Sequence, residues 1–245
     1  MHVIAIDGPA GSGKSTVARA VADRLGLDYL DTGAMYRAVA FAAMRRGIDP
    51  DDDEPVARLA QAVDLDVGER VQVDGADATI EIRSPEVTRA VSTVAANTEV
   101  RHELVQRQRE WAAAHGGGVI EGRDIGTVVF PSATIKIFLT AEDAERAGRR
   151  SKEMLDMHYD KVAADIARRD HADSTRAASP LAMADDAIAV DTTGRSIDDV
   201  VDAVLALVEE ATGTGAGGPE AGGPEVGGTT GDDRPGVGGT RDDRG

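Results

Sequence analysis

Short β-branched runs alternate with longer segments of helical period along most of this chain. Five of the short apolar runs have the length and composition of strands that are buried on both faces. These runs are residues 3–6, 27–30, 118–120, 134–139 and 187–190. Strands that alternate with helical segments are typical of a parallel sheet covered by helices. The pattern therefore predicts an α/β fold of three layers around a five-stranded parallel sheet.

The first helical segment has a clear apolar face and a natural end. Its apolar residues recur at helical spacing, and they are Val17, Ala18, Val21, Ala22 and Leu25. Gly26 follows, and glycine is common immediately after a helix. Further helices are expected at residues 85–95 and 99–114.

The region between residues 65 and 82 departs from this pattern. Residues 65–67, 71–73 and 79–82 are short pieces in which apolar and polar positions alternate, and Asp74-Gly75 favours a tight turn. These features predict a small antiparallel β insertion in the helix-rich part of the chain.

The composition changes abruptly at residue 213. Residues 213–245 are rich in Gly, Pro and Asp and contain almost no apolar residues. Burial cannot offset the entropy of ordering such a segment. We therefore predict one folded domain over residues 1–212 and a disordered tail over residues 213–245.

Charge and cysteine usage exclude several classes of function. The 245 residues include 27 Lys and Arg but 44 Asp and Glu, for a net charge of −17. This excess of acid disfavours binding to a nucleic acid polymer or an anionic membrane, although it also fits adaptation to salt. Any anionic ligand must meet a local concentration of Arg or Lys. With no cysteine, the chain has no disulfide and no thiolate site.

No apolar stretch approaches the length of a membrane span, and the first apolar run is too short for a signal peptide. A cytoplasmic protein is therefore expected. We also expect a monomer.

A phosphate-binding motif lies between the first strand and the first helix. Residues 8–15 read Gly-Pro-Ala-Gly-Ser-Gly-Lys-Ser and match G-x-x-x-x-G-K-[ST]. In this motif the backbone amides and the helix N-terminus surround phosphate oxygens, Lys14 reaches the β and γ phosphates, and Ser15 binds Mg²⁺. The alternative is a glycine turn with an exposed lysine. Switches, motors, ATPases and small kinases share this motif, so it does not identify the reaction.

Two further loops follow predicted strands at the same edge of the sheet. Arg37 lies one turn into the helix after the second strand, where it could hold an anionic acceptor. Glu121, Arg123 and Asp124 lie at the exit of the third strand, with Glu121 expected near the metal. Local salt bridges within the loop are the alternative for this charged group.

Arginines also gather in one later helix. Arg146, Arg149 and Arg150 share one face, which fits binding of an anion. Glu142 and Glu145 precede two of them by four residues, so a solvated face that pairs its own charges is the alternative.

Four motifs in order make a family resemblance specific. They read IDGPAGSGKS at residues 6–15, DTGAMYR at 31–37, EGRDIGTVVFP at 121–131, and RRD with five residues and Arg at 168–176. Over residues 3–208 the chain resembles the bacterial cytidylate kinases, which are P-loop nucleoside monophosphate kinases. The resemblance implies Mg²⁺-dependent phosphoryl transfer from ATP to CMP or dCMP, giving ADP and CDP or dCDP.

The resemblance also assigns roles to individual residues. On the donor side it implies ATP binding by Gly8, Pro9, Ala10, Gly11, Ser12, Gly13, Lys14, Ser15, Thr16, Arg146 and Arg150. On the acceptor side, the positions that hold the phosphate are Thr32, Arg37, Arg123 and Arg176. The positions that face the pyrimidine are Ser92, Arg101 and Asp124, and those near the ribose are Arg169 and Asp173.

Lys14, Arg123 and Arg176 would be catalytic and Ser15 would bind the metal. Residues 63–84 resemble the family's monophosphate-binding insertion, and residues from about 146 to 162 resemble its mobile helical lid. The tail has no counterpart in the family pattern.

The chemistry explains this choice of side chains. The nucleophile is a phosphate oxygen with a second pKa near 6, so it is largely ionised at neutral pH and needs no general base. Catalysis then rests on positioning two polyanions and neutralising their charge. His102, His115, His158 and His171 fit no catalytic spacing and are expected at the surface. Asp124 could accept a hydrogen bond from the cytosine amino group, which uracil lacks.

Two other classes of function stay open at this point. One is a small kinase for a different monophosphate or for a hydroxylated acceptor such as shikimate, with Asp7 or Asp31 as base. The arginine-rich acceptor loops favour an acceptor that already carries phosphate. The other is a non-catalytic nucleotide switch, although the Asn-Lys-x-Asp motif that reads guanine is absent from the chain.

Overall fold

A computed structural model describes residues 2–153 and 159–213 of the chain. Within these residues a parallel five-stranded sheet has the strand order β2-β6-β1-β7-β8. The strands are β1 (His2–Asp7), β2 (Tyr29–Asp31), β6 (Gly117–Gly122), β7 (Ile135–Thr140) and β8 (Ile188–Asp191). The five strands predicted from the apolar runs are confirmed, each shifted by no more than two residues at its start and its end.

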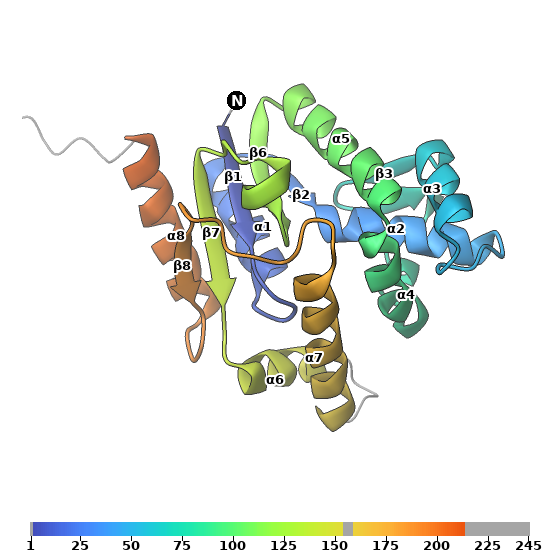
Figure 1. The fold of residues 1–245 in the computed structure, drawn as a ribbon. Coiled ribbons are helices and arrows are strands. Elements are labelled where there is room, and N and C mark those ends of the chain that lie inside the picture. The colour runs from blue at the N-terminus through green and yellow to red at the C-terminus, as the bar shows by residue number, and fades with distance from the viewer. Residues whose placement is uncertain (1, 154–158, 214–245) are drawn as a thin grey trace, which may run out of the picture. The chain divides into compact units, whose positions relative to one another are not determined.

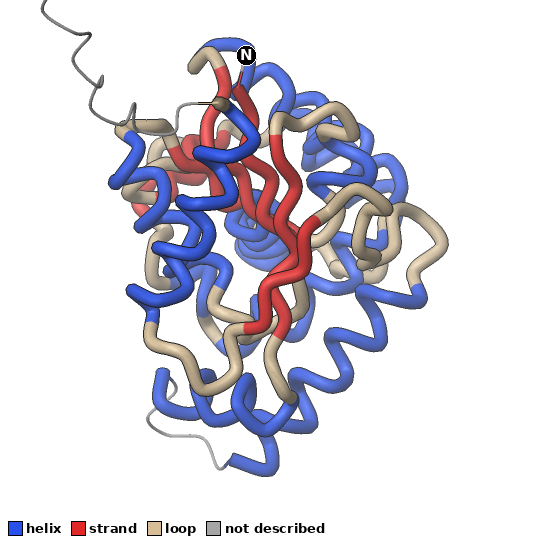
Figure 2. Tube along the Cα trace, turned by 90° about the vertical axis from the view of Figure 1, so that its left-hand side faces the viewer, coloured by secondary structure: helices blue, strands red, loops and turns tan. Residues whose placement is uncertain are grey.

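Alternate residues of the central strand are buried in opposite layers. Val3 and Ala5 of β1 belong to one apolar cluster, whereas Ile4 and Ile6 belong to the other. Successive side chains of a strand point to opposite faces, so both faces of this sheet are covered. Figure 2 shows helices on both sides of the strands. This arrangement confirms the predicted three-layer α/β fold.

Two helices cover one face of the sheet. They are α1 (Lys14–Leu25) and α8 (Ile197–Thr212), and their valines join the cluster that holds Ile4 and Ile6. Gly26 ends α1 in the left-handed conformation with φ of 63°, as predicted. The opposite face packs against a larger group of helices: α2 (Thr32–Arg45), α3 (Asp53–Ala62), α4 (Pro85–Ala96) and α5 (Thr98–Ala114).

The insertion forms a three-stranded antiparallel sheet. Its strands are β3 (Leu65–Val67), β4 (Val71–Val73) and β5 (Ala76–Asp77), and the predicted turn at Asp74-Gly75 joins β4 to β5. Residues 79–82, in contrast, were predicted as a strand, and this is wrong. The chain there leads into the 3₁₀ turn η1 (Glu81–Arg83), which buries Ile82 and leaves Ile80 82% exposed.

The register of the sheet brings three loops to one edge. Asp7 at the end of β1 pairs with Gly122 at the end of β6, and Asp31 at the end of β2 pairs with Glu121. The segments that follow these strands therefore start side by side. In Figure 1, α6 (Asp143–Glu153) and α7 (Tyr159–Thr175) lie beyond this same edge.

Some predicted features lie outside the described residues. They are the tail from residue 214 onward and residues 154–158 of the predicted lid. Among the helices that the structure describes, none is both long and apolar enough to cross a membrane.

Candidate functional site

The predicted phosphate-binding loop joins β1 to α1 in a shape that requires glycine. Gly8 has φ of 149°, and a Cβ atom there would overlap the carbonyl oxygen of Leu139. Gly13 has φ of 88° and precedes the first residue of α1. The loop therefore turns tightly and presents the N-terminus of α1 to its concave side, as an anion site requires.

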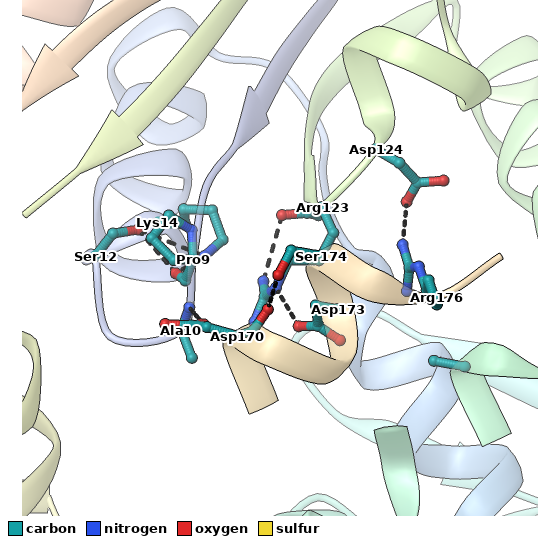
Figure 3. Close-up of polar contacts among 12 residues, drawn as sticks. Pro9, Ala10, Ser12, Lys14, Arg123, Asp124, Asp170, Asp173, Ser174 and Arg176 are labelled. Carbon is teal, nitrogen blue, oxygen red and sulfur yellow. Dashed lines mark hydrogen bonds and ion pairs between the residues drawn. The ribbon is translucent and has the colours of Figure 1, made fainter. Parts of the chain in front are cut away.

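Lys14 crosses the loop and is bound by neutral oxygen atoms. Its Nζ donates to the carbonyl oxygen of Pro9 at 2.6 Å and to Oγ of Ser12 at 3.5 Å (Figure 3). Burial and the nearby guanidinium of Arg123 lower the pKa of Lys14. A phosphate group beside Lys14 would supply the missing negative charge and favour the ammonium form.

Glu121 ends β6 close to the loop. Tyr29 donates a hydrogen bond to its Oε1 at 2.6 Å, and the carboxyl group is buried. Burial and Asp31 raise the pKa of Glu121, while hydrogen bonds from Ser15 and Tyr29 counter part of this rise. A carboxylate and the hydroxyl of Ser15 thus lie together, and both are oxygen donors suited to Mg²⁺.

A second hollow contains every acceptor-side residue predicted from the sequence. It is lined by Thr32, Arg37, Ser92, Arg101, Arg123, Asp124, Arg169, Asp173 and Arg176. These residues come from α2, α4, α5, the segment after β6, and α7 with the residue that follows it. Segments that are far apart in the sequence therefore converge on one pocket.

The chain conformation around Gly122 explains how β2 and β6 meet there. The hydroxyl of Thr32 donates to the carbonyl oxygen of Glu121 at 2.7 Å. A Cβ atom on Gly122 would lie 2.7 Å from the Thr32 hydroxyl oxygen and 2.7 Å from the side chain of Ile125. Glycine at this position therefore lets the two predicted acceptor loops approach each other.

Ion pairs hold the pocket together in the described structure. Asp124 is bound by Arg101 on one side and by Arg176, at 3.4 Å, on the other. Arg123 donates from Nε to Asp173 at 2.9 Å (Figure 3). Burial raises the pKa of Asp124 above its ordinary value, although the guanidinium groups of Arg101 and Arg176 oppose part of this rise. These ion pairs reach from the loop to α5, to α7 and to the residue after α7, so they are not the salt bridges within the loop that were considered as the alternative.

Arg37 and Arg169 add positive charge to this pocket. Arg37 donates to neutral groups, namely the carbonyl oxygen of Ile82 at 3.1 Å and the hydroxyl of Thr88 at 2.9 Å. Burial and the neighbouring Arg169 lower the pKa of Arg37, and burial and Arg123 lower that of Arg169. An anion placed between these side chains would relieve their mutual repulsion.

The two hollows adjoin each other. The cavity beside the phosphate-binding loop is lined by Ala10, Gly11, Gly13, Lys14, Ser15 and Thr16. It shares five residues with the acceptor pocket: Gly33, Arg37, Gly122, Arg123 and Arg169. The phosphate-binding loop and the cluster of arginines therefore line neighbouring hollows that share part of their wall.

The three arginines of α6 have different surroundings. Arg150 lines the cavity beside the loop. Arg149 donates to the carbonyl oxygen of Thr192 at 2.6 Å and to Glu145, so the predicted alternative of a self-paired helix applies to it. Arg146 is buried and donates to the carbonyl oxygen of Ala10 at 2.9 Å. Like Gly8, Pro9 and Ser12, Arg146 does not line the described cavity.

The two carboxylates considered as bases have other partners. Asp7 accepts hydrogen bonds from the backbone N–H groups of Ile125 at 2.9 Å and Gly126 at 2.7 Å, and burial raises its pKa to about 6. Asp31 accepts from the N–H of Ala34 at 2.9 Å and caps α2. His102, His115 and His171 are exposed as predicted, and His158 lies outside the described residues.

Several residues of the site were not singled out from the sequence. Tyr36 lines the acceptor pocket, Arg83 lines the cavity beside the loop, and Asp170 contacts Ala10. Tyr36 and Asp170 each stand inside a quoted motif, next to Arg37 and Arg169, so their neighbours were a usable signal. No spacing in the sequence marks Arg83.

Comparisons with known proteins agree with this site. The family model for cytidylate kinase matches residues 4–210. The chain is 49% identical to a cytidylate kinase of Desulfitobacterium hafniense, across 86% of this chain and 94% of that one. It is 52% identical to a cytidylate kinase of Desulforamulus reducens, across 84% and 96% of the two chains.

A solved structure of an uncharacterized protein from Eubacterium ventriosum is similar in fold. It has a TM-score of 0.51 at 13% identity and covers 85% of this chain and 98% of that one. Residues 4–210, which the family model matches, include every segment that lines the two hollows. The chain belongs to the cytidylate kinase family.

Proposed function

We propose that this protein transfers a phosphoryl group from ATP to CMP or dCMP, giving ADP and CDP or dCDP. The observation that carries the proposal is that the cavity beside the phosphate-binding loop adjoins a pocket lined by five arginines, which are Arg37, Arg101, Arg123, Arg169 and Arg176. The relatives named cytidylate kinase supply the substrate class.

Positioning and charge neutralisation supply the catalysis. Two nucleotides that repel each other must be brought in line, and their phosphates already carry the charge that attack requires. Lys14 faces the donor phosphates, and Arg123 lies where the two hollows meet. Arg176 would hold the acceptor phosphate from the far side. Charge developing on the transferred group is thus met by fixed cations.

The residues beside Lys14 fit a magnesium ion. Ser15 would hold the ion at the N-terminus of α1, and Glu121 would face it, with Tyr29 fixing the orientation of that carboxylate. When bound with ATP, Mg²⁺ would neutralise charge on the β and γ phosphates.

The acceptor pocket divides by chemistry. Thr32, Arg37, Arg123 and Arg176 would contact the monophosphate of CMP, and Arg169 and Asp173 would lie near its ribose. Ser92, Arg101 and Asp124 would face the cytosine ring. Arg101 binds Oδ2 of Asp124 and Arg176 lies 3.4 Å from Oδ1, which holds the carboxylate in place. Oδ1, the oxygen with the longer contact, would accept the hydrogen bond from the cytosine amino group.

The alternatives receive less support from the geometry. A hydroxylated acceptor needs a base, and both candidate carboxylates are engaged with backbone N–H groups. A switch that only binds a nucleotide has no need of a second, arginine-lined pocket. The family relationship points to neither alternative.

An assay of ADP release with ATP, Mg²⁺ and a panel of acceptors tests the proposal. We expect turnover with CMP and dCMP, weaker turnover with UMP, and none with AMP, GMP or shikimate. Turnover with shikimate in place of CMP, or binding of ATP without transfer to any acceptor, would contradict it.

A further inference from the structure

Asp170 and Arg146 bind the two backbone polar groups of Ala10, a residue of the phosphate-binding loop. Asp170 accepts a hydrogen bond from the backbone N–H of Ala10 at 3.0 Å, and Arg146 donates to the carbonyl oxygen of Ala10 at 2.9 Å. The two side chains also bind each other as an ion pair. Figure 3 shows the side chain of Asp170 directed at Ala10. We name this group of three residues the Ala10 clamp.

The three residues of the Ala10 clamp are largely shielded from solvent. Ala10 is buried, and the side chains of Arg146 and Asp170 are 7% and 19% exposed. Asp143 binds Arg146 from the same helix at 2.5 Å. Burial lowers the pKa of Arg146, but the two carboxylates outweigh this effect and raise it overall. Hydrogen bonds between ionised groups away from water are among the stronger ones in proteins.

The backbone of α6 reinforces this contact. A Cβ atom on Gly11 would lie 3.0 Å from the carbonyl oxygen of Arg146 and 3.1 Å from its Cβ. The helix therefore packs directly on the loop residue that follows Ala10.

The helix that carries Asp170 also carries acceptor-side residues. Arg169, Asp173 and Arg176 recur at four- and three-residue spacing, which places them on one face toward the acceptor pocket. Asp170 is one residue on from Arg169, so it lies about 100° around the helix, toward the loop. Donor and acceptor sites are thus attached to adjacent faces of a single rigid element.

We propose that Asp170 is a positioning residue that couples ATP binding at the phosphate-binding loop to CMP binding in the acceptor pocket. Ligand contacts that shift or order the loop act on α7 through the clamp, and α7 sets the places of Arg169, Asp173 and Arg176. Arg146 takes part through Ala10 and Asp170. This inference rests on the proposed function, because it takes ATP and CMP as the two ligands.

The experiment measures the dissociation constant of CMP, without and with a saturating non-hydrolysable ATP analogue, in the full chain. For the wild type we expect the analogue to tighten CMP binding roughly fivefold or more, a common size for coupling between sites. Asp170→Ala should reduce this effect to less than about twofold. Asp170→Asn, which keeps an oxygen for the N–H of Ala10, should retain part of it.

Asp165→Asn is the matched control. It makes the same chemical change on the same helix, in an exposed pair with Arg168 at 3.0 Å, and should keep the wild-type coupling. The inference is overturned if the wild type shows no coupling or if Asp170→Ala retains it. It is also overturned if Asp170→Ala weakens CMP binding equally with and without the analogue, because that result indicates only a structural role.

Turnover of the wild type separates this inference from the proposed function. If the wild type phosphorylates CMP while Asp170→Ala retains coupling, the clamp proposal fails and the function stands. If the wild type does not phosphorylate CMP, the proposed function itself fails.

Discussion

Lys14 shows how a single side chain is prepared for a ligand. Its ammonium group is buried and donates to a carbonyl and a hydroxyl oxygen, so the protein itself supplies no strong counter-charge at hydrogen-bonding distance among the described contacts of Nζ. Keeping a charge buried in this way costs free energy in the absence of a bound anion. The protein therefore carries a local cost that ATP relieves.

Replacing Lys14 separates this ligand role from folding. For Lys14→Ala we expect kcat/KM to fall by about 10²- to 10³-fold, because a cation aimed at the transferred phosphate is lost. The Tm without ligand should be no lower than that of the wild type. Steady-state kinetics and thermal unfolding check the two parts, and near-normal turnover would refute the assignment of the loop.

Asp124 carries the prediction about base choice. Asp124→Asn should reduce the ratio of kcat/KM for CMP over UMP by about 5- to 150-fold, which corresponds to about 1–3 kcal/mol of base discrimination. The absolute kcat/KM for CMP should also fall, because Arg101 and Arg176 lose their counter-charge. An unchanged ratio between the two acceptors would remove Asp124 from this role.

The site residues that could be predicted from the sequence are placed by the ends of strands, whereas those that were missed act through contacts with distant parts of the chain. Lys14 belongs to a known motif after β1, and Arg37 and Arg123 lie in the segments that follow β2 and β6. Their place at the edge of the sheet could therefore be predicted from the sequence. Asp170 and Tyr29 act through contacts with residues far away in the chain, namely Ala10 and Glu121. The first contact depends on how α7 packs against the phosphate-binding loop, and the second depends on the pairing of β2 with β6. The motif around Arg169 draws attention to Asp170, but local spacing names neither partner.

Among the elements, the turn η1 is the one that the sequence pattern predicted wrongly. Alternating apolar and polar residues at 79–82 indicated a strand, but Thr79 accepts a hydrogen bond from the N–H of Val71 at 2.9 Å with its side chain. The chain then turns so that Ile82 packs in the core that includes α2. Periodicity over four residues fits either arrangement, and only the tertiary contacts decide between them.

Ile82 and Ile80 provide a matched pair of substitutions in this region. Ile82→Ala should lower the free energy of unfolding by about 2–5 kcal/mol, since Ile82 is fully buried. It should also raise the KM for CMP, because the cavity left by the side chain loosens the backbone whose carbonyl oxygen binds Arg37. Ile80→Ala should change the stability by less than about 0.5 kcal/mol. Equal effects of the two substitutions on denaturant unfolding would contradict the structure of η1.

The predicted lid, at residues from about 146 to 162, is expected to close when both nucleotides are bound. Closure over the bound nucleotides would exclude water, which would otherwise accept the γ phosphate. Amide hydrogen exchange in this segment should slow when a bisubstrate analogue binds, whereas exchange in α8 (Ile197–Thr212) should be unaffected. Identical exchange with and without the analogue would refute the lid.

At the scale of the whole molecule, charge is distributed unevenly. The chain has a net charge of −17, yet Lys14 and seven arginines line the two adjoining hollows. The general acidity disfavours non-specific contact with polyanions, while the local cations attract small phosphorylated ligands. Composition alone predicts the first property, and only the fold explains the second, since it gathers arginines from α2, α5, the segment after β6, and α7.

The tail is predicted to be dispensable for catalysis. Removal of residues 213–245 should leave kcat and both KM values within about twofold of the full chain, because every residue of the candidate site precedes them. Kinetics on the shortened chain check this expectation. A tenfold loss would show that the tail contributes to the reaction.

The ion pairs of the acceptor pocket limit how this enzyme can change its substrate. The carboxylate expected to recognise cytosine is also the counter-charge of Arg101 and Arg176. A variant that accepts uracil cannot simply exchange Asp124 for a neutral donor, because two guanidinium groups would then repel each other inside the protein. Redesign of the base preference would require compensating replacements on α5 and after α7 in addition to the exchange of Asp124, so three positions must change together.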